Sequence, residues 1–445
     1  MTVARVDVPA STLSARESRT RRRNAAEARF RAYGVIAIAI AILAVVTLVS
    51  SVLSNGLGAF RQTFVTVNVT LDPAILDKNG NRDPEEMKSV TTIGYANLLS
   101  ASLFADLAAQ GISTEGVPDA DVTKLLSQEA PAQLRNMVLG DPSLVGQTIA
   151  FRTYANGRVD GYFKGRVTME SAQRDSNISP QQLELAERMR AAGMMHVGFN
   201  WGFLFGPDAS ELRPEAAGLG IAIIGSAYMM IVVLSLSLPI GVAASIYLEE
   251  FAPRNRITDL IEVNIANLAA VPSIVFGILG LAVFINFAGL PQSAPIVGGL
   301  VLTLMTLPTI IIATRASLKS VPPSIREAAL GVGASKMQMI FHHVLPLAMP
   351  GILTGTIIGM AHALGETAPL LLIGMVAFVR DFPALPPEGF FDPSSALPVQ
   401  VYNWTQRADP AFVERASGAI IVLLVFMLAM NIVAIVMRRR FERRW

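Results

Sequence analysis

The stretch Glu327-Ala328-Ala329-Leu330-Gly331-Val332-Gly333, with the later pair Leu345-Pro346, lies between two long apolar segments. A simple membrane hairpin would need only a polar turn there. Two S-x-x-E/Q patterns frame the stretch, one at Ser324 and one at Ser335, and each predicts a helix start with a capping box. The glycines between them allow a bend. The sequence therefore predicts two short helices at an angle, whose alanines let another backbone approach; an ordinary connecting helix is the alternative.

The composition places the chain in a membrane. Of its 445 residues, 52% are hydrophobic and only 16% are charged, with a mean hydropathy of +0.48, which is too apolar for a soluble protein of this length. Six segments are long enough to cross about 30 Å of hydrocarbon. These predicted spans are 33–53, 217–248, 260–287, 295–318, 349–379 and 417–437. No small-residue cleavage site follows the first span, so we interpret it as an uncleaved anchor.

Basic residues indicate the orientation. Seven arginines lie between 16 and 31, and five lie between 438 and 444. Because such flanks stay in the cytoplasm, we expect both termini and the Glu327 segment on that side, and no nucleic-acid partner for the basic tail. The predicted parts are a cytoplasmic tail (1–32), an anchor (33–53), an exported domain (54–215) and a core with five further spans (216–445).

The exported domain has mixed patterning. Residues 63–71 alternate like a half-buried strand, residues 149–164 resemble a hairpin with its turn at Asn156-Gly157, and residues 180–192 have helical character after Ser179. The sequence predicts a small α+β module. The chain has no cysteine, so this module must be stable without disulfides.

Motifs of catalysis and of metal or cofactor binding do not fit. Residues 331–336, GVGASK, lack the spacing of a phosphate loop, so the chain should not hydrolyse nucleotide itself. The four histidines lack zinc-site spacing. We therefore expect no catalytic residue, no metal and no cofactor.

Prolines and a few ionisable groups mark the predicted spans. Pro239, Pro272, Pro308 and Pro369 interrupt four of the five core spans. Each can bend or break its helix and free N–H groups that suit an anion; shaping of helix packing is the alternative.

Glu366 lies inside the fifth predicted span, one helical turn after His362. Burying a carboxylate in lipid costs on the order of 2–4 kcal/mol, so Glu366 should face the protein interior. It either forms an internal salt bridge, for which Arg315 is a candidate partner, or belongs to a substrate pathway. Because a carboxylate repels anions, a gating role is favoured over direct contact. Arg315 contacts the anion or snorkels to the membrane interface.

The Glu327 stretch resembles the EAA loop of ABC-importer membrane subunits, in which E-A-A, a later G and a final L-P recur at fixed spacing. Glu327, Ala328, Ala329, Gly333, Leu345 and Pro346 fall in register, and His343 stands where the pattern has Ile. The resemblance implies that this helix, with Gly331, docks into a groove on an ATP-hydrolysing subunit.

Three further segments narrow the resemblance. Residues 271–277 (VPSIVFG), 321–327 (VPPSIRE) and 365–371 (GETAPLL) together resemble the A-type permease of the phosphate-specific transport (Pst) system. The likeness covers about 216–445 and implies a type I (MetI-like) permease core, all-α and polytopic, with six transmembrane helices in the whole chain. The exported domain is similar to an extra N-terminal module of a proteobacterial subset. The candidate pathway or gate residues are Ser273, Arg315, His362, Glu366 and Thr367; related permeases often carry Arg at the His362 position.

The resemblance implies a multi-pass inner-membrane subunit of a phosphate importer. Its partners would be a homologous C-type permease, a dimer of ATP-binding subunits and a periplasmic phosphate-binding protein, for which the loop 380–414, with its segment 397–402, is a candidate landing surface; an ordinary packed loop is the alternative. Two other interpretations stay open. One is a permease for another oxyanion (phosphonate, sulfate or molybdate), and the other is a membrane sensor or scaffold that acts through its exported domain.

Overall fold

The computed structural model describes residues 11–376 and 378–441. It divides after Ser54 into two units, and each is described by itself. Of the basic residues predicted to orient the chain, Arg443 and Arg444 lie outside the described range.

The first unit is one long helix, α1 (Ser11–Gly56), which ends two residues into the second unit. It contains the predicted anchor 33–53, and its side chains from Tyr33 to Leu53 are mostly apolar and, except for Val52, exposed. The helix begins well before the anchor because the preceding segment is rich in Ala, Arg and Glu, which are good helix formers. Thus the described part of the predicted tail is helical.

A domain of helices around a small sheet follows α1; we call residues 57–216 the interspan domain. The central strand β1 (Arg61–Thr70) pairs antiparallel with β2 (Thr148–Tyr154) and with β3 (Met195–Phe199), giving the order β2-β1-β3. Its helices are α2 (Pro73–Leu76), α3 (Pro84–Met87), α4 (Thr92–Ala109), α5 (Asp119–Thr123), α6 (Ala130–Gly140), α7 (Gly157–Phe163), α8 (Met169–Ala172), α9 (Pro180–Ala191) and α10 (Trp201–Phe205).

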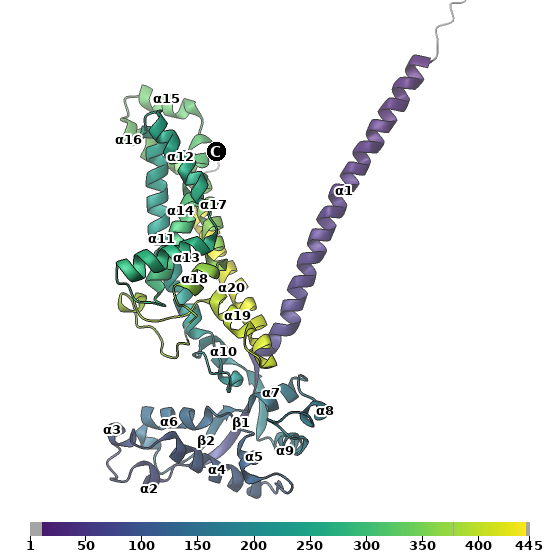
Figure 1. Ribbon diagram of the computed structural model, residues 1–445, viewed down its shortest axis with the longest axis vertical. Coiled ribbons are helices and arrows are strands. Elements are labelled where there is room, and N and C mark those ends of the chain that lie inside the picture. The colour runs from purple at the N-terminus through teal and green to yellow at the C-terminus, as the bar shows by residue number, and fades with distance from the viewer. Residues whose placement is uncertain (1–10, 377, 442–445) are drawn as a thin grey trace, which may run out of the picture. The chain divides into compact units, whose positions relative to one another are not determined.

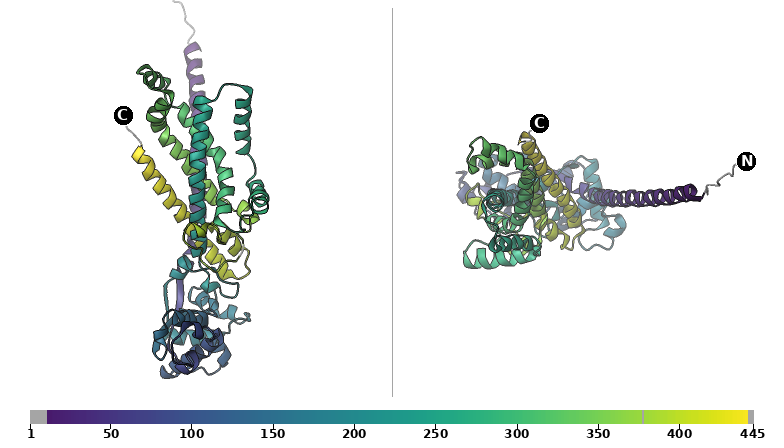
Figure 2. Two further views of the ribbon diagram at one scale, coloured as in Figure 1. Left: turned by 90° about the vertical axis from the view of Figure 1, so that its left-hand side faces the viewer. Right: turned by 90° about the horizontal axis from the view of Figure 1, so that it is seen from above.

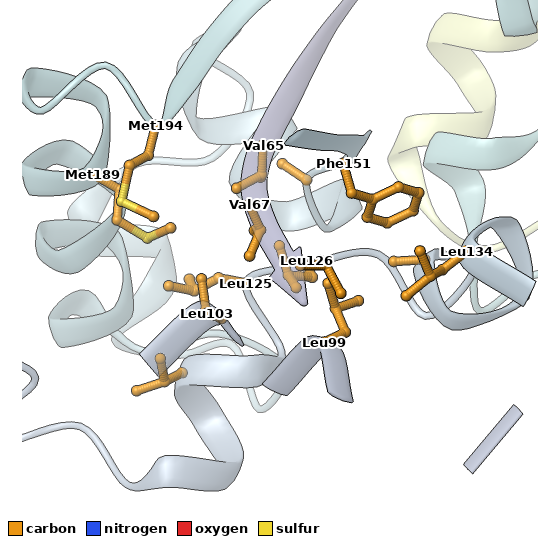
Figure 3. Packing of buried hydrophobic residues seen from close by; sticks show 14 of the residues in the cluster. Val65, Val67, Leu99, Leu103, Leu125, Leu126, Leu134, Phe151, Met189 and Met194 are labelled. Carbon is orange, nitrogen blue, oxygen red and sulfur yellow. The ribbon is translucent and has the colours of Figure 1, made fainter. Parts of the chain in front are cut away.

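The interspan core forms beneath the alternating face of β1. Val65 and Val67 on β1 are fully buried against Leu103 of α4 and Phe151 of β2 (Figure 3). The predicted strand at 63–71 and the helix after Ser179 are both present, and Ser179 caps α9 through a reciprocal capping box.

The predicted hairpin at 149–164 is wrong. The chain leaves β2 at Tyr154 and enters α7, because the Asn156 side chain accepts a hydrogen bond from the Arg158 N–H at 2.8 Å and caps that helix. Asparagine serves equally well in a turn and as a helix cap. The strand partner of β2 is β1, which lies far away in the sequence.

The rest of the described chain, from residue 217 onward, is mostly helical, and we call it the core. Its helices are α11 (Gly220–Ile246), α12 (Arg256–Leu268), α13 (Ser273–Gly280), α14 (Pro295–Lys319), α15 (Pro323–Gly331), α16 (Lys336–Met339), α17 (Leu345–Gly365), α18 (Ala368–Leu372), α19 (Leu397–Thr405) and α20 (Pro410–Phe441). Helices α11, α14 and α17 pack side by side (Figures 1 and 2). The glycines of α11 and α14 allow a close approach: a Cβ on Gly241 would lie 2.7 Å from Ile310 Cγ2, and one on Gly299 would lie 2.5 Å from Val232 Cβ.

The structure corrects the predicted spans. Among the described residues, five helices are long and apolar enough to cross a membrane, and a sixth span exists only if α12 and α13 are counted together. These two helices meet at an angle of 100° across residues 269–272, so the predicted span 260–287 is not one straight helix. The predicted span 349–379 ends as a helix at Gly365.

Only two of the four marked prolines lie at breaks. Pro272 precedes α13 and Pro369 lies in the first turn of α18, whereas α11 and α14 continue through Pro239 and Pro308. Packing against neighbouring helices overrides the proline in both continuous cases.

Helix α19 changes the interpretation of the loop 380–414. Leu397, Pro398, Val399 and Gln400, which we predicted as part of a landing surface, are buried. Trp404 is fully buried as well and donates from Nε1 to Asp208 Oδ1 at 3.0 Å. This segment is therefore a packed element that joins the core to the interspan domain.

A buried ion cluster also fixes the interspan domain to α20. Arg415 is buried and donates to the backbone oxygens of Ala217 and Glu215, at 2.8 and 2.9 Å. Lys164, which follows α7, lies 3.0 Å from Glu414 Oε1 on α20. Isolated buried charges are costly, so these groups stay paired and hold the two parts together.

Glu215 makes the stability of this junction depend on pH. Burial raises the pKa of Glu215 to about 7, against the lowering effect of the hydrogen bond from Ser127 Oγ at 2.5 Å. Because the folded pKa lies above the ordinary value of 4.5, the protonated Glu215 carboxyl stabilises the fold. This contribution to the free energy of unfolding is complete below pH 4.5 and is lost as the pH rises through 7. Between pH 6 and 8 the loss should be about 1 kcal/mol.

The Glu215→Gln variant should show a flatter dependence of the thermal unfolding midpoint on pH than the unaltered chain over this range. Glu211→Gln removes an exposed carboxyl four residues earlier and should leave the dependence as it is. An unchanged slope in Glu215→Gln would show that another group titrates.

Candidate functional site

Helix α15 carries the Glu327 stretch, and its start differs from the prediction. It begins at Pro323, and Ser324 lies inside it without capping it. Proline is preorganised for the first helical position, so two consecutive prolines start this helix without a side-chain cap. The second predicted capping box is confirmed: Gln338 Oε1 accepts from the Ser335 N–H at 2.9 Å, and Ser335 Oγ accepts from the Gln338 N–H at 3.3 Å.

The bend after α15 depends on Gly333. Its φ is +88°, a conformation that side chains disfavour. The Gly333 N–H donates to the Leu330 oxygen at 3.0 Å, and the Ala334 N–H donates to the Ala329 oxygen at 3.1 Å. These two bonds form a Schellman motif, which ends the helix and turns the chain toward α16.

Helix α15 has one packed and one open face. Ala329 is buried in an apolar cluster with Met339, Ile340 and Val344. The open face consists of Glu327, Ala328, Leu330, Gly331 and Val332, all exposed. The Val332 residue is 86% exposed, and a Cβ on Gly331 would meet no atom within 4 Å. Small and apolar groups gathered on an anchored helix suit contact with another protein.

Arg326 anchors α15, a role that the sequence analysis did not assign. Its guanidinium donates to Glu250 Oε1 at 3.0 Å, to the Val321 oxygen at 2.6 Å and to the Leu318 oxygen at 2.8 Å. Leu318 belongs to α14, and Glu250 belongs to η4 (Tyr247–Phe251), the π-helical turn after α11. One side chain thus connects α15 to the ends of two long helices. The only sequence signal was an arginine next to Glu327.

Replacing Arg326 by Gln should loosen α15. The change leaves Glu250 without its charged partner, and losing hydrogen bonds of this kind costs on the order of 2 kcal/mol. Hydrogen exchange at the α15 amides should then become roughly tenfold faster or more. Arg254→Gln, at an exposed position between α11 and α12, is the matched control. Equal exchange in both variants would contradict the anchoring role.

Leu345 and Pro346 begin α17, and both are half-buried. His343 lies just before them in the π-helical turn η6 (Ile340–Val344) and is exposed. A polar histidine is therefore accommodated where the EAA pattern has isoleucine.

Glu366 lies at the break between two helices and not inside one continuous helix. Helix α17 ends at Gly365, and α18 begins at Ala368 with Thr367 at its N-cap. The Glu366 side chain is 19% exposed, and its Oε1 lies 3.4 Å from His362 Nε2. The predicted proximity of His362 and Glu366 is confirmed.

Arg315 belongs to a separate group of charges. Its Nη2 donates to Glu262 Oε1 of α12 at 2.5 Å, and its Nε lies 3.5 Å from Glu249 Oε2. The ion pair that we considered between Arg315 and Glu366 is wrong. Arg315 fastens α12 to α14, and its charge is satisfied there.

Ser273 is the first residue of α13, directly after the 100° bend. Helix α13 packs on α18 with backbones in contact, because a Cβ on Gly277 would lie 2.7 Å from Pro369 Cα. The structure therefore brings together two short helices that each follow a break in the chain. Helix α18 follows Glu366 and Thr367, and α13 begins with Ser273.

Two family descriptions match separate parts of the chain. Residues 237–445 match the family described as binding-protein-dependent transport system inner membrane component, and residues 17–173 match a domain of unknown function, DUF3333. The second match covers most of α1 and most of the interspan domain.

Curated relatives match about half of this chain. The probable ABC transporter permease protein YqgI of Bacillus subtilis is 33% identical over 230 residues, 49% of this chain and 78% of that protein. The phosphate transport system permease protein PstA 2 of Mycobacterium bovis is 32% identical over 251 residues, 56% of this chain and 79% of that protein. The corresponding PstA of Xylella fastidiosa (strain Temecula1) is 30% identical over 218 residues, 49% and 74% of the two chains.

Among solved structures, an inward-facing MetNI methionine ABC transporter is 15% identical over 51% of this chain and 95% of that chain, with a TM-score of 0.38.

Proposed function

Because the chain belongs to the A-type permeases of the phosphate-specific transport family of ABC importers, we propose that it is the transmembrane subunit of an ATP-driven importer of inorganic phosphate. The observation that carries the proposal is α15, a short helix with a small-residue face left open and its opposite face packed and anchored. The names of the phosphate-transport relatives support the choice of substrate.

The open face of α15 docks on a separate ATP-binding subunit in this proposal. Closure of the ATPase dimer pushes α15, and Arg326 passes the movement to α14 and to the end of α11. Helix α14 packs on α17, and Glu366 directly follows the last residue of α17. Movement at the docking site thus reaches the break between α17 and α18 through packed helices.

A homologous C-type permease completes the pathway, and a periplasmic binding protein delivers phosphate to it. With α15 and both termini in the cytoplasm, the interspan domain lies on the outer side. Glu366 acts as a gate: its carboxylate repels a phosphate anion until the movement of α17 and α18 displaces it. Thr367, Ser273 and His362 lie on the elements around this gate.

The test is uptake of radiolabelled phosphate by cells that lack this chain. Uptake should be lost, and a plasmid that carries the unaltered gene should restore it, whereas uptake of sulfate and phosphonate should not change. Loss of sulfate or phosphonate uptake instead would assign the chain to another oxyanion. Normal uptake of all three would contradict the transport proposal.

A further inference from the structure

Three aromatic side chains form an exposed surface where the interspan domain meets the core. Trp201 and Phe205, at the two ends of α10, are 63% and 65% exposed, and Phe199 at the end of β3 is also exposed. The Trp201 ring lies 4.7 Å from the Phe199 ring and stacks on Phe205 at 6.0 Å. We call Phe199, Trp201 and Phe205 the aromatic surface.

The level of this surface along the core is set by Phe203, which lies between Trp201 and Phe205 on α10. Phe203 is fully buried, and a Cβ on Gly418 of α20 would lie 2.9 Å from its Cζ. The uninterrupted apolar run of α20 begins at Gly418. Helix α10 therefore lies beside the first apolar turn of a membrane span.

Two backbone hydrogen bonds give the same level from a second span. The Leu219 N–H donates to the Phe203 oxygen at 2.8 Å, and the Gly220 N–H donates to the Gly206 oxygen at 2.9 Å. Gly220 is the first residue of α11. Since the backbone of α10 is hydrogen-bonded to the start of α11 and the Phe203 ring lies beside Gly418 of α20, α10 lies at the end of these two spans that adjoins the interspan domain (Figure 1).

We propose that the aromatic surface is inserted in the headgroup region of the outer leaflet and anchors the interspan domain to the lipid bilayer. Tryptophan and other aromatic side chains concentrate at this depth, because the ring is apolar and the indole N–H reaches a polar partner. Three neighbouring exposed aromatic rings would be unfavourable in water.

A positively charged side chain, that of Arg152, lies next to the aromatic surface. Arg152 and Tyr154 of β2 line a cavity of 390 Å³ together with Phe199 and Trp201. The Arg152 guanidinium stacks 3.7 Å from the Phe64 ring centroid and is exposed, so its N–H groups can donate to a lipid phosphate. The occupant that fits is a phospholipid headgroup with the upper part of its acyl chains.

Quenching of tryptophan fluorescence tests this proposal. The chain has three tryptophans, and Trp404 is fully buried. The assembled transporter with Trp445→Phe is reconstituted in vesicles of phosphatidylethanolamine and phosphatidylglycerol, with and without brominated acyl chains. The fluorescence of the same preparation with the added change Trp201→Phe is subtracted, and the difference is the fluorescence of Trp201. Bromine near the headgroups should reduce this signal by about half or more, and bromine near the chain ends should reduce it less.

The matched control is the variant Ile93→Trp in the background Trp201→Phe and Trp445→Phe, because Ile93 on α4 is exposed. Brominated lipid should not quench a tryptophan at this position. Quenching at position 93 to the same extent would overturn the assignment to α10. So would quenching of Trp201 by aqueous iodide, which would place it in water. Shielding of Trp201 from both quenchers would also overturn the proposal, because a protein partner would then cover the surface.

Discussion

Replacing Glu327 by Lys is expected to abolish phosphate uptake while the chain still inserts into the membrane at its normal level. Glu327 lies on the open face of α15 and forms no hydrogen bond or ion pair with the residues that the structure describes. Its removal should therefore leave the fold intact. A lysine would place a charge of opposite sign against the partner's groove, and charge mismatch at an interface strongly disfavours binding. We expect uptake to fall by roughly 100-fold or more.

Two measurements separate docking from folding. The ATP-binding subunit should no longer co-purify with Glu327→Lys, and the amount of the chain in isolated membranes should equal that of the unaltered protein. Asp259→Lys, which makes the same charge change at an exposed position of α12, should retain uptake. Normal uptake by Glu327→Lys would end the coupling proposal, and equal loss in both variants would show a general effect of charge.

We assign different roles to neighbouring residues of α15, docking to Glu327 and anchoring to Arg326, and only the proposed docking role could be predicted from the sequence. Glu327, Ala328 and Ala329 fitted a known pattern, so docking could be predicted without a structure. The anchoring by Arg326 could not, because its partner Glu250 lies 76 positions away. Local patterns report local geometry, and a side chain with distant partners needs the fold.

The spans show the same limit. Composition located the apolar segments only approximately, and it did not reveal that the segment 260–287 bends by 100° after Leu268. Residues 269–272, Ala-Ala-Val-Pro, contain one breaking signal, Pro272, and similar prolines in α11 and α14 break nothing. Whether a proline breaks a helix depends on the neighbouring helices, and these are set by tertiary packing.

Some elements of the interspan domain were predictable, but its attachment to the core was not. The alternation in β1 and the capping box of α9 gave the correct elements. The cluster of Lys164, Glu414 and Arg415 joins positions about half the chain apart. Charged residues in a sequence are ordinarily read as solvated, so burial of this cluster could not be inferred.

Replacing Glu366 by Gln tests the gate. Glutamine has nearly the same shape, so the break between α17 and α18 should persist, while the negative charge beside His362 disappears. Transport should fall by roughly 30-fold, because the loss of an interaction made by a charged group costs on the order of 2 kcal/mol and each 1.4 kcal/mol changes a rate about tenfold. The measurement is the initial rate of phosphate uptake, with assembly of the transporter checked by co-purification of the ATP-binding subunit.

The partner variant His362→Gln distinguishes two ways in which Glu366 can act. If Glu366 works only through its contact with His362, both single variants and the double variant should lose uptake to the same degree, because each removes the same 3.4 Å pair. If the carboxylate itself repels the anion, Glu366→Gln should also leak phosphate in the absence of ATP, and His362→Gln should not. The gating proposal requires the second pattern. Unchanged uptake kinetics in Glu366→Gln would reduce this residue to a structural role at the end of α17.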